Sequence, residues 1–139
     1  MVNIDATNLV MGRVASFAAK KALEGEEVNV LNAEKAIISG RKKQIFAKYK
    51  SIRDKGGPHH GPFFPTKPDL ILKRTIRGML PHKRVRGRDA LKKVRVYIGI
   101  PKEFEGKNLE TIKKANKNKF KLPKFTTVEE LAKWLGGKW

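Results

Sequence analysis

The chain has 139 residues, with 32 Lys or Arg against 13 Asp or Glu, and its formal net charge is +19. This length fits one compact domain, and 40% hydrophobic residues is normal for a folded domain and too high for a disordered basic tail. No apolar run is long enough to span a membrane, and Met1–Asp5 lacks the basic head and apolar stretch of a signal peptide. The absence of cysteine excludes disulfides, thiol nucleophiles and thiolate metal sites, and it fits a cytoplasmic protein.

The positive charge is concentrated in the middle of the chain. Residues 41–95 carry 18 basic and 3 acidic residues, a net charge of +15, whereas residues 1–40 have a net charge of −1 and residues 96–139 of +5. Charge of one sign at this density destabilises a compact fold unless a polyanion neutralises it. Nucleic acid is therefore the expected partner, and a merely solvated basic face is the alternative.

The first forty residues predict alternating strands and helices. Apolar residues alternate over residues 2–6, which indicates a short strand. A helix with one apolar face follows from a cap at Thr7 or Asn8, and Gly25 ends it. Two short apolar segments then predict further strands at residues 28–31 and 36–38. A strand, a helix and a strand with tight connections imply a parallel pair with a right-handed crossover.

The rest of the chain predicts more helices, one more strand and two irregular segments. Helices are expected over residues 41–55, from Pro68 to Pro81, and over residues 88–93, with a strand at 94–98. A last helix starts at the capping box Thr127–Glu130. The irregular segments are a Pro/Gly loop at residues 56–68, which holds four of the seven prolines, and a lysine-rich excursion at residues 103–123. We expect a single RNA-binding α/β domain over residues 1–139, with a parallel sheet of about four strands and helices on both faces.

The sequence offers little for catalysis or metal binding. The segment after the first strand has one glycine, Gly12, and no Gly-Lys-Ser or Gly-Lys-Thr, so a nucleotide site is not expected. His59 and His60 are adjacent in the Pro/Gly loop and His82 lies beyond the next helix, a spacing that disfavours a shared metal ion. We expect no catalytic residue, no metal and no cofactor, and we assign the histidines to polar contacts with RNA.

Two neighbouring aromatic residues in the Pro/Gly loop have two interpretations. Phe63 and Phe64 would stack on bases, as aromatic residues do in single-strand binders, or they would anchor the loop to the core. The sequence does not decide between these roles.

The segment Ile76–Arg88 is the most specific stretch of the sequence. Basic side chains lie here among Gly78, Pro81 and Gly87. Glycine lets a backbone approach a phosphate chain closely, and arginine forms bidentate bonds with phosphate. The segment therefore indicates contacts with RNA that go mainly to phosphate and sugar.

At these residues the chain resembles the universal large-subunit ribosomal protein family thirteen (ribosomal protein L-thirteen), and it is most similar to the archaeal branch. The resemblance covers roughly residues 2–100 and rests on Gly12–Ser16, on Val30–Ala36 followed by Ser39-Gly40, and on Arg74–Pro81 followed by Gly87-Arg88. It implies a three-layer α/β/α fold with a four-stranded parallel sheet in the order 3-2-1-4. It also implies a structural, non-enzymatic role on the large subunit, where members bind the large ribosomal RNA and support early assembly.

The expected function is thus a ribosome-associated cytoplasmic protein that binds large-subunit ribosomal RNA and neighbouring large-subunit proteins, with no membrane and no small-molecule substrate. An off-ribosome RNA-binding translational regulator that uses the same surface is the alternative, and an enzyme ranks last. The residues expected to contact RNA are Arg13, Arg41, Lys42, Lys43, Lys48, Arg53, Lys55, His59, His60, Lys67, Arg74, Arg77, Gly78, His82, Lys83, Arg84, Arg86, Gly87 and Arg88.

Overall fold

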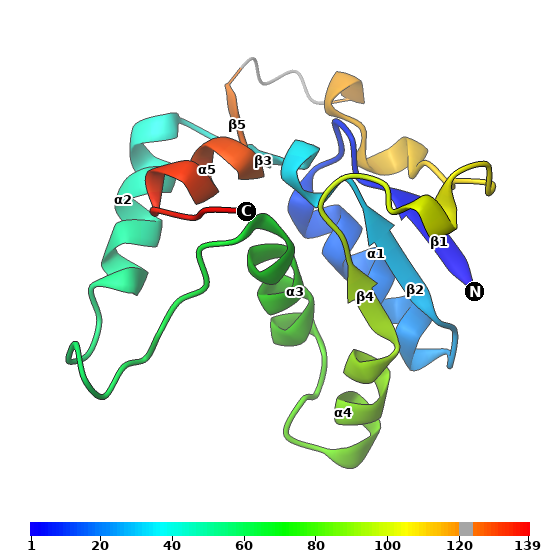
Figure 1. Ribbon diagram of the computed structural model, residues 1–139, viewed down its shortest axis with the longest axis horizontal. Helices are drawn as coiled ribbons and strands as arrows, with labels where there is room; N and C mark the ends of the chain where they lie inside the picture. Colours follow the sequence, from blue (N-terminus) through cyan, green and yellow to red (C-terminus); the bar gives the residue numbers. More distant parts are fainter. Residues whose placement is uncertain (120–123) are drawn as a thin grey trace.

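The computed structural model describes residues 1–119 and 124–139 and has a mixed α/β architecture around a parallel sheet (Figure 1). The sheet contains β1 (Val2–Asp5), β2 (Val28–Leu31) and β4 (Val94–Val96) in the order β1-β2-β4. Both pairs are parallel, with Val2 beside Val28 and Val28 beside Val94. The predicted strands at 28–31 and 94–98, one before the basic region 41–95 and one at its end, are therefore neighbours in the sheet.

One face of the sheet packs against three helices. These are α1 (Met11–Leu23), α3 (Pro68–Met79) and α4 (Val85–Lys92), and α1 contacts both of the others. Side chains of a strand alternate between the two faces, and Ile4 and Val30 on this face share one core with residues of all three helices. The helices therefore hold the basic segments 68–92 against the sheet.

The opposite face of the sheet carries mainly polar side chains, together with the buried Leu31. Asn29 of β2 is 4% exposed and donates its side-chain amide to Asn3 Oδ1 of β1 at 3.0 Å. The core residues of the helices pack against the strand side chains of the first face, such as Ile4 and Val30. Helices on both faces of the sheet, the expected three-layer α/β/α arrangement, are therefore not confirmed among the described residues. A buried asparagine pair needs hydrogen-bonding partners, and an apolar helix face does not supply them.

The expected four-stranded order 3-2-1-4 is not confirmed either. β3 (Ile37–Ser39) forms a separate antiparallel pair with β5 (Phe125–Thr127), and β2 lies at the centre of the parallel sheet. Between β2 and β3 the backbone turns through Asn32, which has a left-handed φ of 54°, and the 3-10 turn Ala33–Lys35. This turn directs β3 away from β2, and β4 occupies the remaining edge of β2.

The remaining elements agree with the predictions in type and differ at their ends. α2 spans Lys42–Arg53, α5 spans Val128–Trp134, and Thr127 caps α5 by accepting from the Glu130 amide at 3.2 Å. α1 begins only at Met11, because Asn8 has a φ of 58° and Thr7 bonds to Asp5 instead of capping a helix. α4 begins three residues earlier than the predicted helix at 88–93.

The lysine-rich segment is attached to the sheet more closely than its composition predicts. Its described part contains the 3-10 turns Lys102–Phe104, Lys113–Ala115 and Lys117–Lys119. Phe104 and Ala115 are buried, and Glu110 forms an isolated parallel bridge with Ile4 at the edge of β1. Residues 120–123 of the predicted excursion lie outside the described residues. Among the described helices, none is both long and apolar enough to cross a membrane.

Candidate nucleic-acid interface

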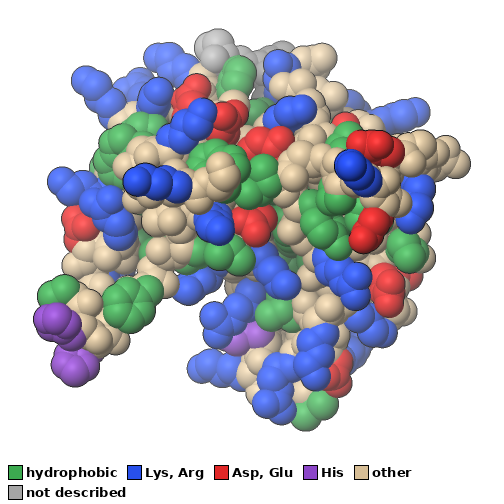
Figure 2. Space-filling view, in the orientation of Figure 1, with side chains coloured by type: hydrophobic (Ala, Val, Ile, Leu, Met, Phe, Trp, Pro, Cys, Tyr) green, Lys and Arg blue, Asp and Glu red, His purple; other side chains and the backbone are tan. Residues whose placement is uncertain are grey.

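A groove with basic walls lies between α3, α4 and the end of the Pro/Gly loop, and it is called the basic groove below. Figure 2 shows the molecule hollowed between the loop and α4, with Lys and Arg side chains along the hollow. Two adjoining hollows of about 320 and 460 Å³ form the groove and share Lys73, Arg77 and Leu91. The lining residues are Pro65, Leu70, Lys73, Arg74, Arg77, His82, Arg88, Leu91 and Lys92.

Helical periodicity explains why cations line this groove. α3 buries Ile71, Leu72 and Ile76 in the core, so Lys73 and Arg77, one helical turn apart, lie toward solvent. Leu80 is buried as well, and the backbone after it turns sharply, with the His82 amide donating to the Leu80 carbonyl at 2.7 Å. After the turn, Arg88 and Lys92 of α4 line the same hollow as Lys73 and Arg77 of α3.

The cations of the groove have few carboxylates near them. In the described part of the chain, Lys73, Arg77 and Arg88 form no ion pair, and Lys92 pairs with Asp89 at 3.5 Å with both side chains largely exposed. An exposed pair of this kind is worth at most about 1 kcal/mol, so it does not neutralise Lys92 firmly. The groove therefore presents uncompensated positive charge over an apolar floor of Leu70 and Leu91.

The predicted RNA contacts around the turn between α3 and α4 lie on two sides, one in the basic groove and one against α1. Lys83 and Arg84 are exposed at the turn. Arg86 lines a different hollow, which lies against α1 and includes Lys20 and Met79. The segment 76–88 therefore contributes Arg77, His82 and Arg88 to the basic groove and the other cations to the surfaces beside it.

The two glycines of this segment have different roles. Gly78 is exposed, and no atom lies within 4 Å of the position that a Cβ would occupy, so close approach of a backbone phosphate is open there. Gly87 is buried, and a Cβ would overlap the carbonyl group of Pro81. The absence of a side chain at Gly87 is therefore needed for packing α4 against the turn, and contact of Gly87 with RNA stays a prediction.

The second group of predicted contacts lies on α2. Lys43, Lys48 and Lys55 are exposed and form no ion pair among the described residues. Lys42 pairs with Glu130 at 3.2 Å and Arg53 with Asp54 at 3.3 Å. α2, with Lys55 just beyond its end, is thus a second basic surface on which Lys42 and Arg53 have carboxylate partners and Lys43, Lys48 and Lys55 have none among the described residues.

A separate hollow joins the start of α1 to α2. It has a volume of about 410 Å³, and its lining includes Gly12, Arg41, Lys48 and the half-buried Tyr49, where burial raises the pKa of the hydroxyl. Arg13 lies next to this hollow and donates from Nη1 to the Lys114 carbonyl at 2.6 Å. Arg13 is therefore held against the lysine-rich segment, and Arg41 and Lys48 are the cations that line this hollow.

The structure gives the two loop phenylalanines different roles. Phe64 packs edge-on against Tyr49 at 5.6 Å between ring centroids, and the Arg74 guanidinium lies 5.7 Å from the Phe64 ring. Phe63 is 69% exposed, and its carbonyl accepts from Arg74 Nη2 at 3.3 Å. Anchoring is therefore the role of Phe64, and Phe63 is free to stack on a base.

The histidines and Lys67 lie apart. His59 and His60 are exposed in the middle of the Pro/Gly loop, and Lys67 is exposed just before α3. His82 is half-buried and lies in the basic groove, with Nδ1 3.4 Å from the Leu80 carbonyl. No group of three or more His, Cys, Asp or Glu side chains that suits a metal ion occurs among the described residues.

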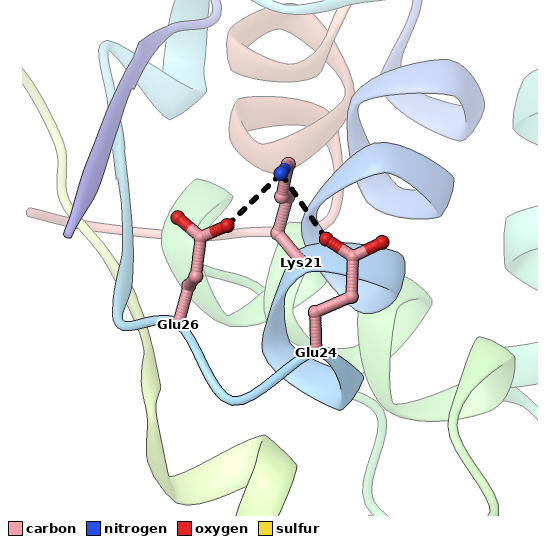
Figure 3. A network of polar contacts seen from close by, with 3 residues as sticks. All are labelled: Lys21, Glu24 and Glu26. Atoms are coloured by element: carbon pink, nitrogen blue, oxygen red, sulfur yellow. Dashed lines mark hydrogen bonds and ion pairs between the residues drawn. The ribbon is translucent and has the colours of Figure 1, made fainter.

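The acidic turn after α1 is partly neutralised by one lysine. Figure 3 shows Lys21 between two carboxylates, with Nζ 3.1 Å from Glu24 and 2.9 Å from Glu26. The hydrogen bond with Glu26, followed by that with Glu24, raises the pKa of Lys21, and the same bond with Lys21 lowers the pKa of Glu26. The lysine thus favours the ionised form of Glu26, which does not suit a general acid.

Two cations of the groove, Lys73 and Lys92, are absent from the predicted contacts. The sequence contains the signal for them, because Lys73 lies four residues before Arg77 and Lys92 four residues after Arg88. Only the apposition of α3 and α4 shows that the two pairs face the same groove.

Comparison with known proteins identifies close relatives. Residues 1–103 match the model of the family described as Ribosomal protein L13. The large ribosomal subunit protein uL13 of Methanococcoides burtonii is 46% identical over 138 residues, which are 99% of each chain. The uL13 proteins of Haloarcula marismortui and Archaeoglobus fulgidus are 47% and 46% identical over 97% and 96% of this chain, and 90% and 86% of their own. These relatives extend the similarity through the lysine-rich segment to the last helix.

Proposed function

The chain belongs to the ribosomal protein L13 family, and we propose on that premise that it is a structural constituent of the large ribosomal subunit that binds large-subunit ribosomal RNA. It is a structural protein and not an enzyme. The relatives from M. burtonii, H. marismortui and A. fulgidus carry the name of a large-subunit protein, which supports the assignment.

The basic groove is the observation that supports RNA as the direct ligand. Its cations, Lys73, Arg77 and Arg88, line both sides of the groove and have no carboxylate partner among the described residues. Phosphates of an RNA backbone supply the missing counter-charge, and the apolar floor at Leu70 and Leu91 suits the carbon face of a ribose. Contacts of this kind recognise the shape of the RNA and not its sequence.

The surface of α2 supplies a second set of phosphate contacts. Arg41, Lys43 and Lys48 are exposed along it, beside the hollow at the start of α1. With the groove it gives the protein two basic surfaces joined by the Pro/Gly loop. A protein that binds RNA on two surfaces holds two segments of RNA together, and this is the basis for a role in early assembly of the subunit.

Neighbouring large-subunit proteins are the other proposed partners, and the protein is expected on ribosomes in the cytoplasm. The second candidate function is translational regulation off the ribosome through the same surface. No observation favours it over the ribosomal role, and the names of the relatives favour the ribosome.

Gradient sedimentation of a native-source lysate tests the proposal, with the protein followed by mass spectrometry before and after a high-salt wash. Co-migration with the large subunit through the wash is expected for an integral ribosomal component. Release by the wash would indicate a peripheral factor held mainly by charge. Material that stays at the top of the gradient throughout would contradict the ribosomal role and favour the regulator.

A further inference from the structure

Two aromatic rings from distant parts of the chain are stacked at the surface. Phe46 of α2 and Trp134 of α5 have ring centroids 4.6 Å apart and planes inclined by 24°. Trp134 is 41% exposed, whereas Leu131 and Ala132 of the same helix are fully buried. Phe46 covers one face of the indole, and the Arg53 guanidinium lies over the ring, so another ring can stack on Trp134 only where the exposed Arg53 side chain moves aside.

Cations flank this stacked pair at both ends. The Arg53 guanidinium lies 5.9 Å from the Trp134 ring centroid, and Lys42 Nζ lies 5.4 Å from the Phe46 ring centroid. Lys42, Phe46 and Arg53 occupy positions i, i+4 and i+11 of α2, which place them on one face of the helix. The result is a row of cation, aromatic, aromatic and cation.

The carboxylates around the pair are already bound by basic residues. Glu130 pairs with Lys42, Asp54 with Arg53, and Glu129 with Lys133 at 2.6 Å. These exposed pairs are weak, so a phosphate can displace the carboxylate from Lys42 or Arg53. The cations around Trp134 favour an anionic ligand, and the exposed ring favours one with a flat group that can stack. RNA has both properties, whereas an acidic protein surface has only the charge.

We propose that Trp134, backed by Phe46, is a stacking platform for one unpaired base of RNA, which takes the place of the Arg53 side chain over the indole, with Arg53 and Lys42 then on the phosphates that flank the base. A nucleotide within a single strand presents the flat π-face of its base and has a phosphate on each side, so it offers one group for the aromatic rings and two for the cations. Stacking on an aromatic side chain accepts any base, so the platform requires an unpaired nucleotide and not a particular sequence. The inference rests on the proposed function for RNA as the ligand and adds a site that shares no residue with the basic groove.

The fluorescence of Trp134 provides a direct test. The chain has two tryptophans, so Trp139→Phe leaves Trp134 as the only one and does not touch the stacked pair. A single-stranded RNA of about 12 nucleotides, within the usual footprint of single-strand binders, is expected to quench this emission as it binds. A duplex RNA of the same length is expected to bind with little quenching, because its bases are already stacked.

Substitutions give an independent readout. Trp134→Leu is expected to weaken binding of the single-stranded RNA by about 5- to 150-fold, whereas Trp134→Phe keeps most of the affinity. Trp139→Leu is the matched control, since Trp139 is exposed to a similar extent and makes no ring or cation contact among the described residues. The fluorescence titration remains decisive if Trp134→Leu does not fold, because Trp139→Phe retains the platform.

The outcomes separate the platform from the proposed function. Binding of single-stranded RNA without quenching, or with equal losses in Trp134→Leu and Trp139→Leu, overturns the platform and leaves RNA binding intact. Quenching by polyglutamate and not by RNA overturns it in favour of a protein partner. Absence of binding to single-stranded, duplex and ribosomal RNA alike contradicts the proposed function itself.

Discussion

The side-chain amide of Asn32 donates a hydrogen bond to Asp5 Oδ1 at 2.9 Å, and this bond joins the carboxyl ends of β1 and β2. Asn32 is 4% exposed, and Asp5 Oδ1 also accepts from the Thr7 amide at 3.0 Å and from the Thr7 hydroxyl at 2.7 Å. Burial alone would raise the pKa of Asp5, but the hydrogen bonds from Asn32 and Thr7 outweigh it, and the pKa is lowered from its ordinary value of 3.8. The same bonds hold the turn in which α1 begins.

Asp5→Asn is expected to remove a pH-dependent part of the stability. Because the folded-state pKa of Asp5 is lowered, its contribution is fully present above 3.8 and is lost as the pH falls through the folded value. Urea unfolding at about pH 7 and about pH 3 measures the difference. The variant should lose stability at the higher pH and little at the lower, with exposed Glu103→Gln as the control; an equal loss at both pH values would contradict this role.

Gly87→Ala and Gly78→Ala are expected to have opposite effects on stability. A methyl group at residue 87 overlaps the Pro81 carbonyl, and overpacking of this kind costs about 1–3 kcal/mol. A methyl group at residue 78 enters open space within α3 and should stabilise the protein by about 0.5–1 kcal/mol. Thermal unfolding of the two variants beside the parent protein makes the comparison, and a Gly87→Ala protein as stable as the parent would show that the turn adjusts freely.

Removal of Arg77 and Arg84 together is expected to weaken RNA binding and to leave the fold intact. Both side chains are exposed, so circular dichroism should show unchanged helix content. Two lost charge-assisted contacts should lower the affinity at least about tenfold. The matched control replaces the exposed Lys102 and Lys107 by alanine outside the groove. Normal binding by the double arginine variant would mean that segment 76–88 is misassigned.

The affinity for RNA is expected to fall steeply with salt. If about eight phosphates are neutralised, the slope of log affinity against log salt should be about −6 to −7. Filter binding to large-subunit RNA across a salt series measures it, and the double arginine variant should show a shallower slope by about 1 to 2. A slope near zero would remove the electrostatic basis of the interface.

Much of the candidate site could be predicted because exposure follows from local pattern. The basic, glycine-containing segment around Arg77 predicts its exposure. In the structure Arg77 lies outside the buried apolar stripe of α3, which contains Ile71, Leu72 and Ile76. The place of Lys73 and Lys92 in the groove and the packing role of Gly87 could not be predicted, because each depends on which segment lies opposite. The sequence does not indicate the stacking of Trp134 on Phe46, because the two residues are far apart in the chain.

The sequence by itself determined the helices, four of the five strands that the structure describes, and the resemblance to the family; the strand β5 was not predicted. Periodicity, Pro68 at the start of α3 and the cap at Thr127 are local, and they act over one or two turns of chain whatever the rest of the fold does. The tertiary structure alone decided the order of the sheet, the pairing of β3 with β5, and the meeting of α3 with α4 across the basic groove. These arrangements join residues far apart in the chain, and the free energy that selects them comes from burial and hydrogen bonding between segments, which no single stretch of sequence contains.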